Sequence, residues 1–494
     1  MSFTAKTLPL LGIAILVATC DRERTPPPER TDQEQARRQE GLLLSNRGAL
    51  FLQQGRPQRA LIALQQAVER VPDLAEAHFN LGMAYARLGQ HPEAVSAFQR
   101  ALELNPRDPV LHFALGTSLR AQHRYPEAAA QFQQAIDLAP ERAEYHFHLG
   151  EARRAMSDFD GAMKAFAEAT RLDSSQVDAL FLYSDLLARS DRLPEAEAGF
   201  KRLLKLDPRR VPAYLGLGTA YAKQGRPQEA ISLLQQAIAL EPRNATAYYL
   251  LNQACLKAGQ KLQGEAALRT FQRLSAAERN FDLGNVYARR GEWNQAIASL
   301  TQAIQADSSF GEAHLRLGLA HLQKGETANA IPLLKRAVVL SPKNLDAYCF
   351  LGEVYLQAND REAAHQTFAA ALRLDSTSVR ASYGMGRAQL MRKKLPEAIQ
   401  SLHQALSGDP DHRESYYHLG LAYAEQERYR EAVVCFRQSI ALDSTYADAY
   451  YALGALLVQH KDYAAAKEAL EKVLRLNPDH PRAREKLAQL DQML

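Results

Sequence analysis

The chain repeats a short pattern at a fixed period, and this period limits the possible folds more than any other feature of the sequence. When the Leu-Gly dipeptides and their equivalents are aligned, thirteen positions follow one another at the step that separates Gly48 from Gly82, and only the step from Asn252 to Gly284 is shorter, by two residues. A period of this size indicates an array of supersecondary units that stack on one another. The thirteen positions, called key positions below, are Gly48, Gly82, Gly116, Gly150, Ser184, Gly218, Asn252, Gly284, Gly318, Gly352, Gly386, Gly420 and Gly454.

Each repeat reads as two short helices. In residues 75–106, apolar residues recur at helical spacing in two runs that the sequence LGQHPE separates. The second run commonly stops at proline, and elsewhere at Asp-Ser-Ser or Asp-Ser-Thr, which we expect to cap the following helix. Alanine recurs at one place in the second run, Ala94 in this repeat, and only Gly264 departs from it. Such small residues let two helix backbones approach closely.

The second repeat contains a set of residues at fixed places, namely Leu81, Gly82, Tyr85, Ala94, Phe98, Ala101 and Pro106. With these residues it resembles the tetratricopeptide repeat family. The match extends over about residues 41–480 and recurs thirteen times. The resemblance implies an all-α solenoid, a right-handed superhelix of about thirteen helical hairpins in which each first helix lines a concave groove. Residues 481–494 form one more amphipathic helix, suited to capping the open end of the array.

The one short interval predicts a division of the solenoid. Here Gly264 replaces the small alanine, Phe271 stands where alanine is usual, and the terminal proline is missing. Two missing residues must shorten a helix end or a turn, and a bulky phenylalanine displaces the next hairpin. We therefore expect one lobe over residues 32–276 and a second over residues 277–480.

The amino terminus reads as a targeting segment. The apolar run of residues 7–19 is too short to span a bilayer but fits the core of a signal peptide over residues 1–19. The run ends in Val-Ala-Thr-Cys, which resembles a bacterial lipoprotein signal, with Cys20 as the lipid-modified mature terminus. A cleaved secretory signal and an uncleaved anchor are the alternatives. Residues 20–31 are charged and proline-rich, which predicts a disordered tether.

No catalytic or metal site is expected. The sequence contains no GxSxG or HExxH motif, and Gly-Met-Gly at 384–386 lies inside a predicted helix. Cys255, Cys349 and Cys435 are scattered and read as buried thiols. Histidines occupy one repeat position, four residues before the key position, where packing is favoured over a metal-binding row. These histidines are His78, His112, His146 and His314.

Two rows of residues indicate a binding groove. The 60 basic and 56 acidic residues lie in no long block of one sign, so nucleic acid is not an expected partner. Aromatic side chains with cations nearby suit a peptide or protein partner. The aromatic row stands three residues before the key positions and comprises Phe79, Phe113, Phe147, Phe181, Tyr249, Phe281, Tyr383, Tyr417 and Tyr451. The basic row stands five residues after them and comprises Arg87, Arg189, Lys223, Lys257 and Arg289.

The sequence therefore predicts a non-enzymatic scaffold that binds protein or peptide partners without a cofactor. The lipid anchor predicts attachment to a membrane of the bacterial cell envelope, facing the periplasm or the exterior. One alternative is a non-catalytic subunit of a surface-polysaccharide or secretion assembly. A second is a cytoplasmic adaptor, if the amino terminus is not processed, and a third is an enzyme activity grafted on the solenoid.

Overall fold

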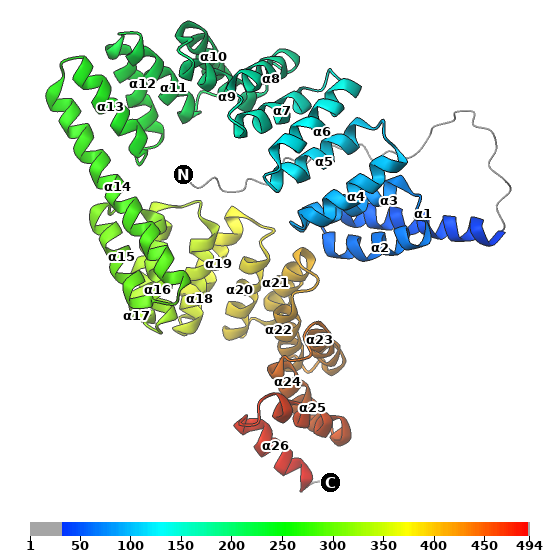
Figure 1. Ribbon diagram of the computed structural model, residues 1–494. Helices are drawn as coiled ribbons and strands as arrows, with labels where there is room; N and C mark the ends of the chain where they lie inside the picture. Colours follow the sequence, from blue (N-terminus) through cyan, green and yellow to red (C-terminus); the bar gives the residue numbers. More distant parts are fainter. Residues whose placement is uncertain (1–31, 493–494) are drawn as a thin grey trace. The chain divides into compact units, whose positions relative to one another are not determined.

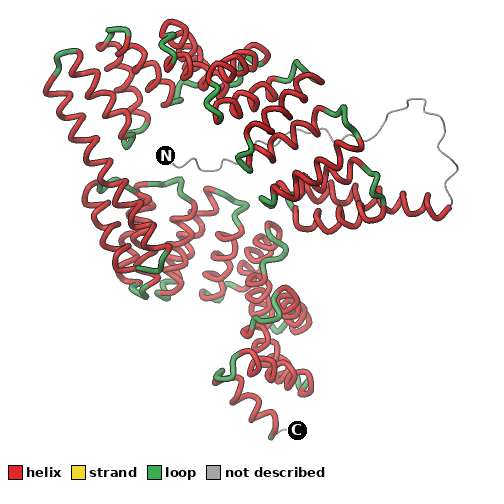
Figure 2. The backbone as a smooth tube through the Cα atoms, in the orientation of Figure 1, coloured by secondary structure: helices red, strands yellow, loops and turns green. Residues whose placement is uncertain are grey.

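The computed structural model describes residues 32–492, and this part of the chain is built from helices joined by short turns, with no strand (Figures 1 and 2). The predicted signal peptide, Cys20 and the tether lie outside the described residues. The chain divides into two compact units, one ending at Leu240 and the other beginning at Glu241. The prediction of an all-α repeat fold is confirmed.

The described part of the first unit holds six helical hairpins, which are repeats one to six. Each pair of consecutive helices packs along its length. The helices are α1 (Asp32–Gln53), α2 (Pro57–Arg70), α3 (Ala75–Arg87), α4 (His91–Leu104), α5 (Pro109–Ala121), α6 (Tyr125–Leu138), α7 (Ala143–Ala155), α8 (Phe159–Leu172), α9 (Val177–Arg189), α10 (Leu193–Leu206), α11 (Val211–Lys223) and α12 (Pro227–Leu240).

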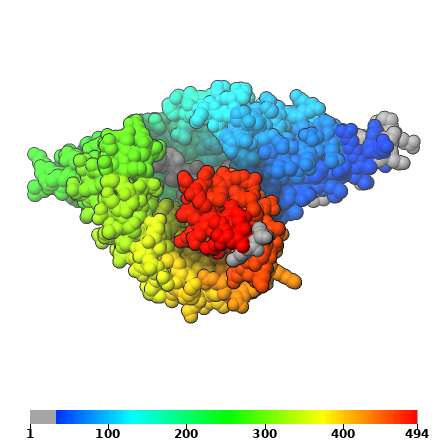
Figure 3. Space-filling view, turned by 90° about the horizontal axis from the view of Figure 1, so that it is seen from below, coloured from blue at the N-terminus to red at the C-terminus, as the bar shows by residue number. Residues whose placement is uncertain are grey.

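The second unit holds repeats seven to thirteen and a final helix. That helix, α26, packs on α25 and lies at the front of the view in Figure 3. The helices are α13 (Ala245–Lys257), α14 (Lys261–Arg289), α15 (Trp293–Ala306), α16 (Gly311–Gln323), α17 (Thr327–Leu340), α18 (Leu345–Gln357), α19 (Arg361–Leu374), α20 (Val379–Met391), α21 (Leu395–Gly408), α22 (Arg413–Glu425), α23 (Tyr429–Leu442), α24 (Ala447–Gln459), α25 (Tyr463–Leu476) and α26 (Pro481–Asp491).

A left-handed residue ends the first helix of every repeat. The residue seven positions after the key position has a positive φ in all thirteen repeats, and it is glycine in six of them. The other seven are His123, Ser157, Asp191, Asn359, Lys393, Glu427 and Lys461. A single residue in this conformation reverses the chain, so that the second helix folds back on the first.

The key glycines make room for the largest core side chains. A Cβ atom added at Gly82 would lie 2.6 Å from the ring of Phe98, which stands on the second helix of the same repeat and is fully buried. The same contact recurs with Phe or Leu in the other repeats. Because the glycine has no side chain, the aromatic ring reaches the backbone of the first helix.

The two exceptions at the key position are compensated on the facing helix. Ser184 replaces glycine in the fifth repeat, and Gly199 on α10 leaves space for its hydroxyl. Asn252 replaces glycine in the seventh repeat, where a Cβ added at Gly264 would lie 3.2 Å from the Asn252 Oδ1 atom. Gly264 therefore stands in place of the usual alanine because Asn252 occupies the space that its methyl group would need.

The shortened interval fuses two helices into one. The second helix of repeat seven and the first helix of repeat eight form α14, a continuous helix of 29 residues (Figure 1). The sequence led us to expect a shortened end or turn near residue 276, whereas the two missing residues remove the turn altogether. Phe271 packs on Tyr249 of α13, with ring centres 5.4 Å apart. The compact units divide one repeat earlier than the predicted lobes, between repeats six and seven.

A buried ion pair lies beside α14. The carboxylate of Asp307, 1% exposed, accepts a hydrogen bond of 2.6 Å from Arg243 Nε, and Arg273 Nη1 lies 3.7 Å away. The Arg243 guanidinium also stacks 3.5 Å from the ring centre of Phe310. Burial alone would raise the pKa of Asp307, but hydrogen bonds from Arg243 and Ser309 lower it. The start of repeat seven is thus tied to the end of repeat eight across α14.

The Asp-Ser-Ser and Asp-Ser-Thr sequences act differently from the prediction. Asp173 is the residue that ends α8, and its carboxylate accepts from the backbone N–H of Ser175 at 2.9 Å within the turn. Asp375 and Asp443 make the same local bond to Thr377 and Thr445. The aspartates therefore hold the turn that leads to the next helix and do not cap that helix, because they stand too early in the chain.

Candidate partner-binding surface

The first helices of the repeats line the concave side of the array. In the second unit α20 contacts α22, α22 contacts α24 and α24 contacts α26, and in the first unit α1, α3, α5 and α7 contact one another in sequence. The layers of a curved stack approach most closely on its inner side, so the first helices form the inner surface. Both predicted rows lie on these first helices. Some of their members also pack within or between repeats.

Most side chains of the aromatic row are partly buried in the core of a repeat and partly exposed on the concave surface. In five repeats the aromatic side chain of the first helix packs against the buried phenylalanine of the second helix, with ring centres 5.8 to 6.3 Å apart. Exposure varies along the row: Tyr249 is 44% exposed, whereas Phe113 is 6% exposed. The remaining members are partly buried. These side chains therefore stabilise the repeats and still present one edge to the concave surface, except for Phe113, which belongs to the core.

Two members of the basic row are bound to the preceding repeat. Lys223 Nζ donates to the carbonyl oxygen of Ala188 at 3.2 Å, and Arg87 Nη1 donates to the carbonyl oxygen of Leu52. Each cation binds a carbonyl oxygen in the last turn of the first helix one repeat earlier and complements the dipole of that helix. The structure therefore gives Lys223 and Arg87 a role between repeats that sequence spacing did not reveal.

All five members of the basic row are exposed and are the last residues of their helices, including the other three. Arg189 lies 3.9 Å from Asp185 and 5.5 Å from the ring centre of Phe159. Lys257 and Arg289 are the last residues of α13 and α14 and are exposed. These three remain the better candidates for contact with a partner.

A second aromatic row joins the first in repeats eleven to thirteen. His412, Tyr446 and His480 stand one full repeat period apart, each just before a first helix. Together with Tyr383, Tyr417, Tyr451 and His418 they form a set that we call the aromatic ladder. The distances between ring centres are 4.9 Å for Tyr383 and His412, 5.3 Å for Tyr417 and Tyr446, and 5.0 Å for Tyr451 and His480.

The sequence analysis identified three members of this ladder, Tyr383, Tyr417 and Tyr451, and missed the ring that pairs with each of them. The missed residues stand at a constant distance in sequence after the row members with which they pair, in the turn that precedes the next repeat. The signal that could have found them is the same repeat period, applied to the turns. Phe281 and Phe310 make the same contact in repeat eight, at 4.8 Å.

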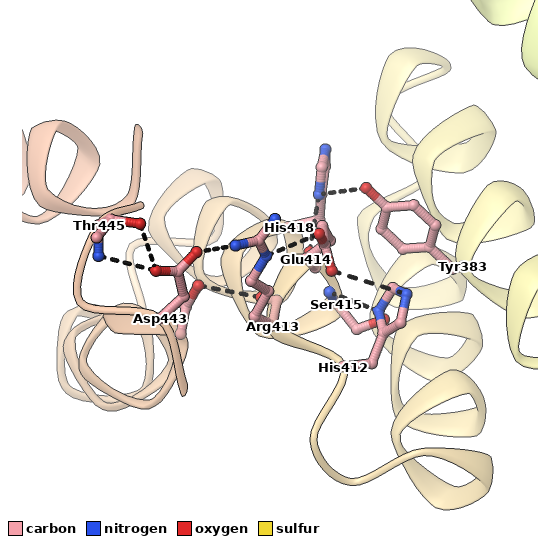
Figure 4. A network of polar contacts seen from close by, with 9 residues as sticks. Tyr383, His412, Arg413, Glu414, Ser415, His418, Asp443 and Thr445 are labelled. Carbon is pink, nitrogen blue, oxygen red and sulfur yellow. Dashed lines mark hydrogen bonds and ion pairs between the residues drawn. The ribbon is translucent and has the colours of Figure 1, made fainter. Parts of the chain in front are cut away.

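His418 connects two rungs of the ladder, and Figure 4 shows its contact with Tyr383. Its ring centre lies 5.3 Å from Tyr383 and 5.0 Å from Tyr417, and its Nδ1 atom lies 2.9 Å from the carbonyl oxygen of Glu414. A carbonyl oxygen only accepts, so Nδ1 carries the proton and can share it with the Tyr383 oxygen at 3.3 Å. Burial lowers the pKa of His418 to about 4 and raises the pKa of Tyr383 to about 12. His418 and Tyr383 are therefore uncharged near neutral pH.

Ion pairs hold the turns around the ladder. Arg413 Nε donates to Glu414 at 2.8 Å, and the same guanidinium pairs with Asp443 and lies 5.1 Å from the ring centre of Tyr446 (Figure 4). Ser439 Oγ donates to the carbonyl oxygen of Arg413 at 3.0 Å. The pKa of Glu414 is lowered because the hydrogen bond and charge of Arg413 outweigh the effect of its burial. The polar groups here are satisfied within the protein.

A groove of about 800 Å³ opens at the end of the ladder, between α22, α24 and α26. Its lining includes the row members Tyr417 and Tyr451, together with His480. The charged residues that line it are Asp448, Arg482 and Lys486. The apolar residues that line it include Leu421, Phe436, Leu456 and Val458. A smaller cavity, about 490 Å³, lies against the second helices α21 and α23.

The row of histidines has a structural role. The imidazole Nε2 atoms of His78, His112 and His146 lie 2.9 to 3.2 Å from the carbonyl oxygen of the proline six residues earlier, to which they donate. Tyr214 and Tyr248 donate to Pro208 and Pro242 in the same way, at 3.0 and 3.2 Å. The side chain at this position therefore anchors the turn between repeats, as the packing interpretation favoured. His314 is buried and binds the Phe310 carbonyl instead, at 3.0 Å.

The cysteines of the described region are buried free thiols, as predicted. Burial raises the pKa of Cys349 and of Cys435 to about 11, and raises that of Cys255 as well. Over residues 32–492 no three His, Cys, Asp or Glu side chains are grouped in a way that could hold a metal ion. None of the helices described combines the length and the apolar character that crossing a membrane requires.

Three family models match parts of the chain. Two tetratricopeptide repeat models match residues 281–344 and 394–447, and residues 321–381 and 423–490. The model described as the C-terminal domain of cilia and flagella-associated protein 70 matches residues 50–282. No curated protein sequence matches the chain.

Several solved structures are similar to the chain at low sequence identity. The chain is similar to the structure titled APC/C hetero-tetramer Cut9-Hcn1, at 17% identity and a TM-score of 0.41, over 93% of this chain and 96% of that one. It is also similar to YrrB, titled a TPR protein with an unusual peptide-binding site, at 23% identity and a TM-score of 0.35, over 37% and 95% of the chains. Pseudomonas aeruginosa pilF follows at 22% identity and a TM-score of 0.38, over 43% and 96%.

The repeat period, the paired helices, the glycine and phenylalanine contacts and the family models agree with one another. Proteins with these repeats bind protein or peptide partners. The chain belongs to the tetratricopeptide repeat family.

Proposed function

We propose that the protein is a membrane-tethered scaffold that binds a protein or peptide partner on the concave surface of its repeats. The observation that carries this proposal is the groove of about 800 Å³ between α22, α24 and α26, where aromatic and apolar side chains meet charged ones on the inner surface. Apolar grooves with a few polar groups are the usual sites of peptide and ligand binding. The non-catalytic subunit of a surface-polysaccharide or secretion assembly is a narrower form of the same function.

The membrane part of the proposal rests on the amino-terminal sequence. An apolar run that ends at Cys20 and continues into a charged, proline-rich segment is typical of a lipidated and tethered terminus. Mass spectrometry of the mature protein should find an acylated cysteine at the amino terminus. Cys20→Ser should release the protein from membranes without changing its helix content. A mature protein that begins with unmodified Met1 would favour the cytoplasmic adaptor instead.

The concave surface is tested by comparing two charge-matched variants of the full chain. Arg189, Lys257 and Arg289, three exposed members of the basic row, are changed to glutamate together, whereas Arg87 and Lys223 are left unchanged because they bind the preceding repeat. The control changes Arg269, Arg336 and Arg437, which are exposed on second helices, to glutamate. A partner captured with the wild-type protein should bind the concave variant at least tenfold more weakly and the control equally well. Equal losses in both variants would contradict concave binding.

A further inference from the structure

We propose that the groove between α22, α24 and α26 binds an acidic segment of a partner protein whose apolar side chains stand beside its carboxylates. The inference rests on the proposed function, because it assigns a chemical class to the partner of the same concave surface. It concerns only the last two repeats and the final helix.

The floor of the groove is suited to apolar side chains. Leu421 on α22, Phe436 on α23 and Leu456 on α24 line it, together with small alanines at 424, 452 and 455. Small residues on first helices deepen the groove, because no long side chain fills the space in front of them. Burial of a leucine or phenylalanine side chain of a partner there would stabilise the complex, because it removes apolar surface from water.

The aromatic walls of the groove are held rigidly. Tyr417 packs between His418 and Tyr446, and Tyr451 packs on His480, with ring centres 5.0 Å apart. The Nδ1 atom of His480 accepts the backbone N–H of Ala483 at 3.1 Å, so its proton is carried by Nε2. Rings that are fixed before binding lose little conformational entropy when a partner stacks on them. The free imidazole N–H adds a donor to the groove.

The charges of the groove favour a negatively charged partner. Arg482 and Lys486 line it from α26, whereas Asp448 is the one carboxylate in the lining. Among residues 32–492 neither Arg482 nor Lys486 has an ion-pair partner, while the nearby cations Lys467 and Arg484 are bound to Asp491 and Asp479. Within the described part of the chain, the groove thus has two unpaired cations beside an apolar floor. It is complementary to a segment that carries carboxylates and apolar side chains together.

The final helix differs from the repeats at these positions. Arg482 stands one repeat period after Asp448 and two periods after Glu414, so a cation replaces the two acidic residues of repeats twelve and thirteen. Lys486 likewise stands one period after Ala452. A helix whose only task is to cap the array needs polar residues on its outer face and not cations on the groove side. Helix α26 therefore both closes the core and completes a binding groove.

The test uses the purified full-length chain and a fluorescent peptide. The peptide has twelve residues, in which glutamate alternates with an apolar residue, and the apolar residues are leucine and phenylalanine in turn. Both ends are blocked, so that only the side chains carry charge. Two matched peptides replace either every glutamate by lysine or every apolar residue by serine. Fluorescence anisotropy at two salt concentrations measures their affinities. The acidic amphipathic peptide should bind at least tenfold more tightly than both, with weaker binding at high salt.

Variants locate the site. Arg482→Glu with Lys486→Glu should weaken binding of the acidic peptide at least tenfold, and Tyr451→Leu should weaken it at least threefold. The control, Arg475→Glu with Arg484→Glu, makes the same change of charge on α25 and α26 outside the groove. It should change the affinity less than twofold. Circular dichroism of each variant checks that the helices are retained. If the charge variant unfolds, Tyr451→Leu still tests the groove, because it keeps an apolar side chain at that position.

Several results would overturn the inference. One is that the lysine peptide binds as tightly as the acidic peptide. Another is that the groove variant and its control lose the same affinity. A third is that the acidic peptide does not bind at about 1 mM, a concentration well above the dissociation constant expected for a peptide in a groove. If that happens while the variants of Arg189, Lys257 and Arg289 still lose a captured partner, the scaffold function stands and only this assignment fails.

Discussion

Glu427 holds the left-handed turn of repeat twelve, at a position that is glycine in six other repeats. Its φ is +60°, and Gly225 at the equivalent position has a φ of +75°. A side chain in this conformation costs free energy that glycine avoids. Glu427→Gly should therefore raise the free energy of unfolding by about 0.5 to 1 kcal/mol, measured by urea denaturation.

Two substitutions control this prediction. Glu427→Ala removes the charge and keeps the Cβ atom, so it should give no comparable gain. Gly225→Ala should cost about 1 kcal/mol, because alanine is strained where φ is positive. A gain of equal size from alanine at 427 would show that charge and not backbone conformation governs the effect.

His418 predicts how stability depends on pH. Burial lowers its pKa to about 4, below the ordinary value of 6.5, so the folded protein binds fewer protons than the unfolded chain between these two values. Stability from this group is complete above pH 6.5 and is lost as the pH falls towards 4, by up to about 3 kcal/mol.

The contribution of His418 is isolated by substitution. His418→Gln removes the titrating group, so the difference in unfolding free energy between variant and wild type should shrink as the pH falls from neutral towards the pKa of His418. Chemical denaturation followed by the fluorescence of Trp293, the single tryptophan, provides the measurement in the same compact unit. Parallel pH profiles of the two proteins would show that His418 is not the group responsible.

At the scale of elements, α14 is helical at a residue where the other repeats have a turn. Ala276 stands at the repeat position where eight other repeats carry proline, for example Pro208 and Pro242. In a continuous helix proline removes a backbone hydrogen bond and clashes with the preceding turn, at a cost of about 3 kcal/mol. Ala276→Pro should therefore destabilise the second unit by about that amount, measured by thermal unfolding.

The matched control is Ser444→Pro. Ser444 stands at the same position of repeat twelve, in the turn between α23 and α24, and the preceding residue Asp443 has the extended backbone that proline accepts. The unfolding temperature should change little in this variant. If proline is tolerated equally at both positions, α14 bends or breaks at 276 as the sequence suggested.

At the scale of the whole molecule, the two compact units predict more than one unfolding step. The core residues form separate clusters within each unit, and coupling between repeats acts mainly between neighbours. Trp293 packs on the cluster of Leu300 and Leu317 in the second unit and reports only that unit, whereas circular dichroism reports both. The two probes should give unfolding curves with different midpoints. Coincident curves would show a single cooperative structure.

Fragments decide where the array divides. The predicted lobes meet at 276 and 277, inside α14, while the compact units meet after Leu240. A fragment of residues 241–494 keeps α14 and the pair of Arg243 with Asp307, whereas a fragment of residues 277–494 lacks both α13 and the first half of α14. The longer fragment should therefore unfold at the higher temperature. A shorter fragment of equal stability would favour the boundary at 276.

The sequence by itself determined the repeat architecture, because thirteen copies of one pattern fix which residues are helical, which are small and which turn the chain. Gly82 and Phe98 could be recognised as a pair of repeat positions before any coordinates were known. The aromatic row followed from the same spacing, since the period carries each side chain onto the equivalent face of every first helix.

The tertiary structure decided what depends on neighbours that are distant in sequence. The spacing could not show that Lys223 satisfies the Ala188 carbonyl, because that contact joins two repeats. It could not show whether two missing residues shorten a turn or fuse two helices, since both keep the apolar pattern. The groove with Arg482 and Lys486 likewise arises only when the final helix packs against repeat thirteen, where local sequence periodicity ends and packing geometry selects the partners.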